Sequence, residues 1–569
     1  MPTSTDRTMR VLPSGRALAT WTPHQATAAE LVVGARVWPL RMTLLAVIAA
    51  ASAFRWYLLL RYYVTPDADQ TIVGLMARHV LLGERPIFYW GQPYTGAPEA
   101  YLTAGLFGLV GQSDVLLHIV PLAASVAFVV VTCVLAWRLY GPGIAALTGL
   151  YLSAAPILLM EWSAWAGSGY LEMMALGTAA LLLVLPAPMG QPNRSWWRVP
   201  AAFFLLGLAA WIQPSAIFYA LGVLALLVGR AWAVARAPRR WLSGLALSLC
   251  ALAALAVGML PMLIFNVQHQ GQTVSYLLQR DTATSLSTLT VFSRALLWSG
   301  PIVLGLIPPT TDRTYLSRFL LDHYAMYGIA LFVVLALLFR GLSLWRAVWA
   351  RVRTVFTQHP APDLGLIVLL AGLLVGFLSS SWGAEQWSGS QPRYLLPLYT
   401  AVPLILRAAL PRRPRAWHWT LAALALIALC AGNLFTNSTT FGREDLRPLA
   451  RLLQARGITA VYGDYWTVYP IIYESEERIA GVATNDDLAR GYNRRLMYLQ
   501  AAASSSHFAW VVATGSARQR AVLACFQRLH SRYGVVIWRD QTIYDRPTGR
   551  AFPYWNGGRC PLISPASAS

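Results

Sequence analysis

The sequence predicts a polytopic α-helical membrane protein of about eleven transmembrane helices, followed by a C-terminal extracytoplasmic α/β domain. Three observations predict this fold class. Of the 569 residues, 56% are hydrophobic and only 12% are charged, about half the charged fraction of a soluble protein. Apolar runs of about 20 residues, the length that crosses a bilayer core, recur along most of the chain. Arginine residues gather in the short loops between these runs.

The positive charge of the chain follows its loops. The formal net charge is +21 at pH 7. The arginines lie between apolar segments, as they do in the cytoplasmic loops of membrane proteins. They do not form the single basic face with which a protein follows a nucleic-acid groove. We therefore expect no nucleic-acid partner. Residues 1–40 are polar and lack the short apolar core and cleavage site of a signal peptide, so they predict a cytoplasmic tail.

Eleven apolar segments predict the spans. They lie near Met42–Leu60, Val115–Trp137, Gly143–Glu161, Tyr170–Met189, Pro200–Ile212, Ser215–Gly229, Trp241–Phe265, Leu321–Arg340, Leu364–Ser381, Tyr394–Leu410 and His418–Phe435. The fifth and sixth are short and meet at Gln213-Pro214, where one long kinked helix is the alternative, because proline breaks a helix interior. Arginines flank this pair on both sides, for example Arg198 and Arg230. Because arginine-rich loops stay in the cytoplasm, both ends of the pair are expected there, and the chain must cross the membrane an even number of times between them.

The same rule predicts a multi-pass protein of the cell inner or plasma membrane, with the amino terminus inside and the carboxyl terminus outside. Four polar segments then share the outward face: loop 61–114, loop 267–320, the short loop Trp382–Arg393 and everything after Asn437. The predicted domains are the tail 1–40, the membrane domain 41–436 and the extracytoplasmic domain 437–569. No internal repeat like the inverted halves of many secondary transporters is visible.

Residues after Asn437 alternate in character as a small α/β domain does. Strands are predicted at Thr459–Tyr462, Arg478–Ala483, Ala509–Ala513, Val535–Arg539 and Gln541–Tyr544, and helices at Arg443–Arg456, within Asn485–Ala503 and within Ala517–Tyr533. No GxGxxG motif or P-loop is present, so the sequence carries no nucleotide-binding signature. None of the five cysteines has metal-ligand spacing, and a disulfide between Cys525 and Cys560 stays open for an exported domain.

The loop between the first two spans carries the strongest functional signal. Asp67 and Asp69 lie just beyond a hydrophobic helix, where ionised carboxylates need water, a partner or a substrate. An aspartate there can take a proton from an attacking hydroxyl or amine, and an arginine can pair bidentately with phosphate oxygens. The further candidates for a polar head-group site on this face are Arg78, His79, Gln92, Tyr94, Glu99, Glu172, Asn266, Arg393 and Tyr394.

Several of these residues also have a purely structural interpretation. Arg393 could snorkel at a helix end, and Glu172 could cap a helix amino terminus. Asn266 could cap a helix carboxyl terminus, and His79 could be an interfacial residue of an amphipathic helix. The spacing Asp67-Ala-Asp69 suits a divalent cation such as Mg²⁺ or Mn²⁺, although so short a motif is a weak signal by itself.

Four stretches stand out as a combination: Asp69-Gln-Thr-Ile-Val-Gly-Leu-Met-Ala-Arg-His, then GERPIFYWGQPYTGAPEAYL, then Gly258, Pro261 and Asn266, and finally RYLLPLY at Arg393–Tyr399. Taken together, they resemble the GT-C superfamily of membrane glycosyltransferases, in its protein-mannosyltransferase-like and aminoarabinose-transferase-like branch. They cover the membrane half of the chain, residues 40 to 435. The resemblance is specific as a combination of motifs rather than motif by motif.

The resemblance implies an enzyme that moves a sugar from a polyprenyl-phosphate carrier to a glycan, lipid or protein acceptor on the outward face, with inversion at the anomeric carbon. It implies Asp69 as the general base and Arg393 as a ligand of the donor phosphate. Where relatives often carry Asp-Glu, this chain has Asp69-Gln70, so a second carboxylate or a metal would need Asp67 or Glu99. The extracytoplasmic domain would lie over the site and help to bind the acceptor.

Two other classes of function compete with this one. A transporter or lipid flippase places ionisable groups near the bilayer midplane on broken helices. The break at Gln213-Pro214 fits that class, whereas carboxylates gathered at one surface favour transfer chemistry. A non-catalytic assembly protein would keep its function when Asp69 is replaced by asparagine.

Overall fold

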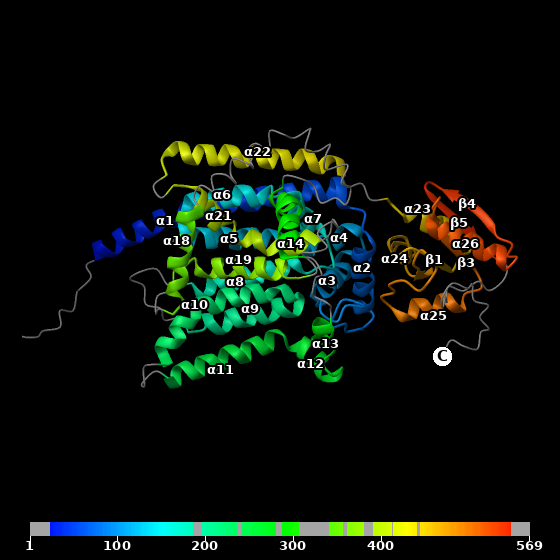
Figure 1. Cartoon of the computed structure of the whole chain (residues 1–569), viewed down its shortest axis with the longest axis horizontal. Helices are drawn as coiled ribbons and strands as arrows, with labels where there is room; N and C mark the ends of the chain where they lie inside the picture. Colours follow the sequence, from blue (N-terminus) through cyan, green and yellow to red (C-terminus); the bar gives the residue numbers. More distant parts are fainter. Residues whose placement is uncertain are drawn as a thin grey trace, which may run out of the picture.

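The computed structural model describes residues 23–185, 196–235, 241–279, 287–305, 341–356, 361–380, 391–411, 414–440 and 444–547. They form an elongated bundle of helices with a smaller sheet domain, residues 444–547, at one end (Figure 1). The predicted eighth span at Leu321–Arg340 lies outside these residues. Cys560 also lies outside them, so its pairing with Cys525 stays a prediction.

The helical part is built mainly of apolar helices that lie side by side in Figure 1. The helices are α1 Pro23–Leu58, α2 Ala68–Leu81, α3 Pro98–Val110, α4 Asp114–Leu117, α5 Ile119–Tyr140, α6 Pro142–Ser153, α7 Ile157–Ala164, α8 Tyr170–Val184, α9 Arg198–Ile212, α10 Ile217–Ala235, α11 Trp241–Gly258, α12 Leu260–Gln268, α13 Gln272–Gln279, α14 Thr288–Arg294, α15 Gly300–Leu304, α18 Gly341–Val352, α19 Leu364–Leu378, α21 Val402–Ala409 and α22 Ala416–Thr440. Short π or 3₁₀ turns are η1 Leu59–Tyr63, η2 Pro214–Ala216, η3 Ala295–Ser299, η4 Arg353–Phe356 and η5 Gln391–Ala401.

Within the described ranges, two straight helices are long and apolar enough to cross a bilayer, at Leu40–Arg61 and Asp114–Tyr140. Two bent helix pairs bring this number to four if each pair is one span. Shorter apolar helices coincide with other predicted spans: Tyr170–Val184, Arg198–Ile212, Pro214–Val228, Leu364–Leu378 and Ala416–Leu429. Apolar helices are thus found at the predicted spans other than the eighth, which lies outside the described residues, and the tenth. The tenth, Tyr394–Leu410, is instead the end of the 3₁₀ segment η5 followed by the short helix α21. The count of eleven crossings stays a prediction.

Two predicted spans are bent where single straight helices were expected. The third is broken between α6 and α7 by 67°, because Pro156 cannot continue the helix. The seventh bends by 70° between α11 and α12, where Pro261 lies in the first turn of α12. The first break leaves the carbonyls of Leu152 and Ser153 without helical donors, and the buried guanidinium of Arg55 donates hydrogen bonds to both at 3.1 Å.

The sheet domain has the predicted α/β character. Its elements are α23 Arg447–Ala455, β1 Ala460–Gly463, α24 Tyr465–Glu474, β2 Ala480–Ala483, α25 Leu496–Ser504, β3 Phe508–Ala513, α26 Ala517–Arg528, β4 Gly534–Trp538 and β5 Gln541–Asp545. The strand order is β2-β1-β3-β5-β4. Strand β1 pairs in parallel with β2 and β3, and β5 pairs antiparallel with β3 and β4. All five predicted strands are present.

Two local predictions in this domain were incomplete. The helix α24 between β1 and β2 was missed; its start is capped by Asp464, whose carboxylate accepts from the backbone N–H groups of Trp466 and Thr467. The helix expected within Asn485–Ala503 is α25, and it occupies only the last part of that range. Residues 484–495 form a loop that returns along β2 instead. Asn493 fixes this loop by accepting from the N–H of Ala483 and donating to its carbonyl.

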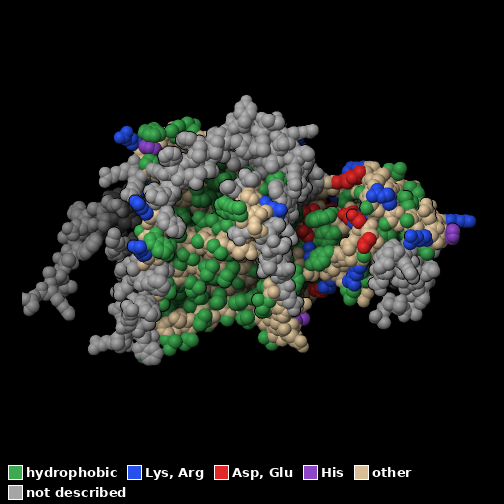
Figure 2. Space-filling model, in the orientation of Figure 1, with side chains coloured by type: hydrophobic (Ala, Val, Ile, Leu, Met, Phe, Trp, Pro, Cys, Tyr) green, Lys and Arg blue, Asp and Glu red, His purple; other side chains and the backbone are tan. Residues whose placement is uncertain are grey.

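The sheet domain is joined to the bundle by one continuous hydrophobic core. Side chains of α2 and α3, among them Ile72 and Phe107, belong to the same buried cluster as Val468 and Ile472 of α24. Figure 2 shows apolar side chains over the visible flank of the helices, whereas acidic side chains gather on and beside the sheet domain. We call the surface between α2–α4 and the sheet domain the junction.

Gly74 allows α2 and α24 to pack closely at the junction, and its replacement gives a first prediction. A Cβ at this position would overlap the ring of Tyr473, a side chain that is 1% exposed. Gly74→Ala should lower the free energy of unfolding by about 1–3 kcal/mol through overpacking, measured as the unfolding temperature of the purified full-length protein. Gly105→Ala in α3 is the matched control, because nothing lies within 4 Å of its added Cβ. Equal effects of the two substitutions would refute this account of α2–α24 packing.

A second prediction concerns Glu474, at the end of α24. Burial raises the pKa of its carboxyl from 4.5 to about 7, with the charge of Asp114 as the next cause. The other charged groups that face it are Arg447, Asp445 and Arg78. Because the folded pKa is raised, the folded state favours the protonated acid. This contribution to stability is complete below about pH 4.5 and is lost as the pH rises through about 7.

Glu474→Gln should therefore unfold at a higher temperature than the wild type well above pH 7, where the wild-type carboxyl is ionised. The difference should shrink toward pH 4.5. Thermal unfolding of the full-length protein across this range measures it. Glu476→Gln serves as a surface control, because that side chain is 67% exposed. A pH-independent difference would contradict the buried-acid account.

Candidate active site

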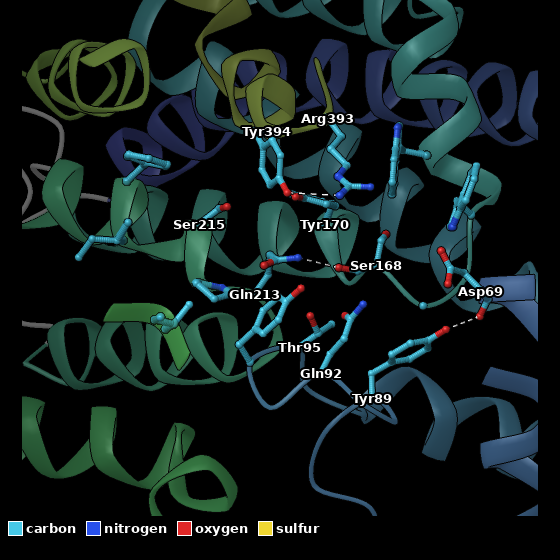
Figure 3. Close-up of a pocket in the computed structure, with 18 residues that line it drawn as sticks. Asp69, Tyr89, Gln92, Thr95, Ser168, Tyr170, Gln213, Ser215, Arg393 and Tyr394 are labelled. Atoms are coloured by element: carbon cyan, nitrogen blue, oxygen red, sulfur yellow. Dashed lines mark hydrogen bonds between the residues drawn. The ribbon is translucent and has the colours of Figure 1, made fainter. Parts of the chain in front are cut away.

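A cavity of about 220 Å³ opens where the start of α2 meets the ends of several bundle helices (Figure 3). Its walls come from the first outward loop, the α7–α8 turn, the α9–α10 break and η5. The lining residues are Asp69, Tyr89, Gln92, Tyr94, Thr95, Trp162, Trp165, Gly167, Ser168, Tyr170, Gln213, Pro214, Ser215, Ile217, Phe218, Leu277, Arg393 and Tyr394. Five of the predicted site residues meet here: Asp69, Gln92, Tyr94, Arg393 and Tyr394.

Asp69 is in the first turn of α2, and its side chain is 29% exposed. Its backbone carbonyl accepts a hydrogen bond of 2.7 Å from the hydroxyl of Tyr89, another residue that lines the cavity. Burial, and then the charge of Asp69, raise the pKa of Tyr89 well above its ordinary value, so this phenol stays protonated. A partly exposed carboxylate at a cavity edge has the access that a general base needs.

Asp67, predicted as a second catalytic carboxylate, caps α2 in the structure. Its side chain accepts from the N–H of Gln70, and the Gln70 side chain accepts from the N–H of Asp67, each at 2.9 Å. This capping box fixes the helix start that carries Asp69. Asp67 does not line the cavity, and within the described residues no group of three or more His, Cys, Asp or Glu side chains could hold a metal ion.

Arg393 enters the cavity from η5, beside Tyr394 and Tyr170 in Figure 3. Its guanidinium donates to the Tyr394 hydroxyl at 3.3 Å and lies over the rings of Tyr394 and Trp162, at 5.1 and 5.7 Å from their centroids. Over the part of the chain that the structure describes, Arg393 has no carboxylate partner. A largely enclosed positive charge without a counter-ion is costly, so this end of the cavity suits an anion.

Arg78 and His79 lie at the junction rather than in the cavity. Arg78 donates to the carbonyl of Tyr473 at 2.8 Å and stacks over that ring at 4.5 Å. The two ring nitrogens of His79 contact Glu84 at 2.7 Å and Glu477 at 2.9 Å. Both predicted ligands therefore hold the sheet domain to α2.

Glu99 is buried directly behind the cavity wall. Its Oε2 accepts from the N–H of Gly167, which lines the cavity, at 2.7 Å, while its Oε1 is buried without a hydrogen-bond partner among the described residues. Burial, followed by the charge of Glu172, raises the pKa of the Glu99 carboxyl well above its ordinary value. Glu172, in the first turn of α8, also has one buried, unpartnered oxygen. Neither carboxyl reaches the cavity directly.

Asn266 connects α12 to α13 and does not line the cavity. It donates to the carbonyl of Met262 at 2.8 Å and accepts from the N–H of Thr273 at 3.1 Å. These contacts are those of a residue that stabilises a helix end. A second, open groove of about 530 Å³ lies nearby; it shares Tyr89 and Gln92 with the cavity and is also lined by Glu84, Trp90 and Arg495.

Two residues of the sheet domain contact Asp69 and were not predicted. Tyr465 of α24 and Arg494 of the loop 484–495 both reach its Oδ1. They are 396 and 425 positions away in the chain, and no motif spacing connects residues so far apart. A concentration of tyrosines around Arg494, in the stretches Tyr465–Tyr473 and Tyr492, was the available signal.

The fold has known counterparts among solved structures. ArnT from Cupriavidus metallidurans in the apo state matches with a TM-score of 0.59 and 14% identity, over 88% of this chain and 97% of that chain. The same protein bound to undecaprenyl phosphate matches with a TM-score of 0.58 and 14% identity, over 90% and 99%. Arabinofuranosyltransferase AftD from Mycobacteria matches with a TM-score of 0.45 and 14% identity, over 88% and 40%.

Protein-family models and curated protein sequences give no match. The two ArnT structures show that this chain shares their fold. The predicted resemblance is therefore confirmed at the level of the fold. At this level the fold class is confirmed as well: a polytopic membrane protein with a C-terminal domain that contains a sheet.

Substitutions of Glu99 give a prediction that distinguishes a neutral from an ionised Glu99 carboxyl. Burial and the charge of Glu172 raise the pKa of the Glu99 carboxyl and so favour its neutral form. We therefore expect Glu99→Gln to keep both the acceptor for Gly167 and the wild-type unfolding temperature. Glu99→Ala leaves the Gly167 N–H without its acceptor and should cost about 1–3 kcal/mol of stability. Equal destabilisation by both substitutions would show that Glu99 is ionised in its site.

Proposed function

We propose that this protein is an integral-membrane glycosyltransferase that moves a sugar from a polyprenyl-phosphate-linked donor to an acceptor on the extracytoplasmic face, with Asp69 as the general base. The observation that carries this proposal is the cavity itself: a partly exposed carboxylate lines the same space as a guanidinium that has no ionic partner among the described residues. The likeness to ArnT, solved with undecaprenyl phosphate, supports the class of donor.

Arg393 would bind the donor phosphate. A guanidinium can donate two parallel hydrogen bonds to two oxygens of one phosphate group. The rings of Tyr394 and Trp162 contact the Arg393 guanidinium and fix its plane. The phosphate charge would supply the counter-ion that Arg393 lacks among the described residues. As the bond from the anomeric carbon to phosphate breaks, charge grows on the leaving polyprenyl phosphate, and Arg393 would stabilise it.

Asp69 would act on the acceptor. The acceptor hydroxyl or amine attacks the anomeric carbon, gives its proton to the Asp69 carboxylate and forms the new bond while the carrier phosphate leaves with its electron pair. Attack from the side opposite to the phosphate inverts the anomeric carbon. The open groove that shares Tyr89 and Gln92 with the cavity would admit a glycan, lipid or protein acceptor.

The proposal includes the predicted topology of eleven spans, with residues 1–40 in the cytoplasm and residues 437–569 outside. In that arrangement loop 61–114, η5 and the sheet domain share the extracytoplasmic side. This agrees with a site at the bundle end nearest the sheet domain (Figure 1). The donor would enter laterally from the membrane, between helices.

A transporter or lipid flippase is the second candidate, favoured by one observation. The backbone break between α9 and α10 lines the cavity with Gln213, Pro214 and Ser215, and broken helices at a polar cavity are typical of transporters. Transfer chemistry needs Asp69, whereas movement of an intact lipid does not form or break a glycosidic bond.

Transfer of radiolabelled sugar from a polyprenyl-phosphate donor pool tests the proposal, in membranes that contain equal amounts of wild type or Asp69→Asn. We expect label in an acceptor with the wild type and at least a 100-fold lower rate with the variant, since removal of a general base costs about 10²–10⁴-fold. Equal rates would remove Asp69 as the base. A wild type that moves intact labelled lipid across the membrane, without forming a new product, would favour the transporter.

Arg393 gives a separate prediction about donor binding. Arg393→Leu should abolish binding of radiolabelled undecaprenyl phosphate to the purified protein, and Arg393→Lys should bind it more weakly, because lysine lacks the bidentate fork. Arg407→Leu is a control in the same segment, since Arg407 donates to carbonyls at the end of α21 and does not line the cavity. Undiminished binding by Arg393→Leu would show that the phosphate lies elsewhere.

A further inference from the structure

Two side chains of the sheet domain hold the carboxylate of Asp69. The hydroxyl of Tyr465 donates to Oδ1 at 2.5 Å, and Nη2 of Arg494 donates to the same oxygen at 3.0 Å. The Arg494 side chain is only 5% exposed. The arginine side of this ion pair is thus shielded from bulk water, which screens an ion pair that is fully exposed.

Arg494 is itself held rigidly at the junction. Its guanidinium packs against three tyrosine rings, at 4.2 Å from Tyr492, 5.0 Å from Tyr89 and 5.4 Å from Tyr465. Its Nη1 donates to the Tyr492 hydroxyl at 3.0 Å and to the carbonyl of Trp90 at 3.4 Å. The side chain therefore contacts the sheet domain, the first outward loop and α2 at once.

Tyr465 links the arginine to the aspartate. Its hydroxyl accepts from Nε of Arg494 at 3.0 Å while it donates to Asp69. Burial, and then the charge of Asp69, raise the pKa of Tyr465 above its ordinary value, so the phenol keeps the proton that it donates. The Tyr465 hydroxyl, the Arg494 guanidinium and Oδ1 of Asp69 thus form a closed triangle of hydrogen bonds.

The other oxygen of Asp69, Oδ2, is available to accept a proton from the acceptor. Oδ2 receives no hydrogen bond from any residue in the described ranges, and Asp69 lines the cavity edge in Figure 3. A carboxylate anchored by one oxygen has lost the rotation that would turn its second oxygen away from a bound acceptor. Such restriction is what makes a bound base effective.

We propose that Arg494 and Tyr465 are positioning residues of the transfer site: they hold Oδ1 of Asp69 so that Oδ2 faces the acceptor. The sheet domain thereby completes the active site instead of only covering it. This inference rests on the proposed function of Asp69. It assigns neither Arg494 nor Tyr465 a contact with the reacting atoms.

The test uses the full-length protein with Arg494→Met, Arg494→Lys and Tyr465→Phe. Two quantities are measured for each: the rate of sugar transfer from the polyprenyl-phosphate pool in membranes, and the binding of radiolabelled undecaprenyl phosphate to the purified protein. Arg518→Met is the matched control, because Arg518 is also a largely buried arginine of the sheet domain, 12% exposed, but pairs with Asp464 and Asp486 away from the cavity.

Arg494→Met should lower the transfer rate by about 10- to 100-fold, the cost of a misplaced catalytic group, and leave undecaprenyl phosphate binding unchanged. Arg494→Lys should restore part of the rate, because its ammonium can still reach Oδ1. Arg494→Met combined with Asp69→Asn should be no slower than Asp69→Asn alone, since the two residues act as one unit. Arg518→Met should retain both rate and binding.

Other results overturn the inference in distinguishable ways. A wild-type rate in Arg494→Met, with Asp69→Asn inactive, removes the positioning role and leaves the proposed function in place. A faster Arg494→Met would identify an inhibitory latch, and lost carrier binding would make Arg494 a donor ligand. An inactive wild type, or an active Asp69→Asn, defeats the proposed function itself. If Arg494→Met misfolds, Tyr465→Phe decides: it removes only a hydroxyl, and an unchanged rate would falsify the inference.

Discussion

The packing of α24 against α2 is the contact on which the candidate site depends. α2 carries Asp69 in its first turn and Gly74 on the face that meets Tyr473, while α24 carries Tyr465 at its start. Burial of the apolar faces of both helices in one core supplies the non-directional attraction. The polar contacts around Asp69 then select one geometry out of the many that such attraction would allow.

Irregular backbone is concentrated around the cavity. The α9–α10 break, the α7–α8 turn with Gly169 at φ +64°, and the 3₁₀ segment η5 all line it. Backbone polar groups freed from helices need partners away from lipid, and here they find them: the Ile212 carbonyl accepts from the Gly96 N–H at 3.1 Å, and the Ser168 carbonyl accepts from Gln213 at 3.0 Å. The backbone breaks beside the cavity thus find their hydrogen-bond partners in the neighbouring loop and turn.

The sequence predicted the parts of this arrangement that depend on local pattern. Apolar runs located most helices of the bundle, alternation located the five strands, and the position of an acidic residue after the first span singled out Asp69. Asp67, predicted as a second catalytic carboxylate, caps α2 together with Gln70 in the structure, and the Asp67–Gln70 spacing is itself a capping-box signature. Its catalytic role stays a prediction. Arg494 and Tyr465 escaped prediction because their importance comes from a tertiary contact, and Arg78 and His79 proved to be junction residues for the same reason.

The separation of Asp69 and Arg494 along the chain has a consequence for the order in which the protein is made. Asp69 leaves the ribosome 425 residues before Arg494, so its carboxylate is synthesised while this partner is still untranslated. Until the sheet domain has folded, neither Tyr465 nor Arg494 can contact the Asp69 carboxylate. Under the proposed function, a chain interrupted late in synthesis would therefore carry the base without the two contacts that orient it.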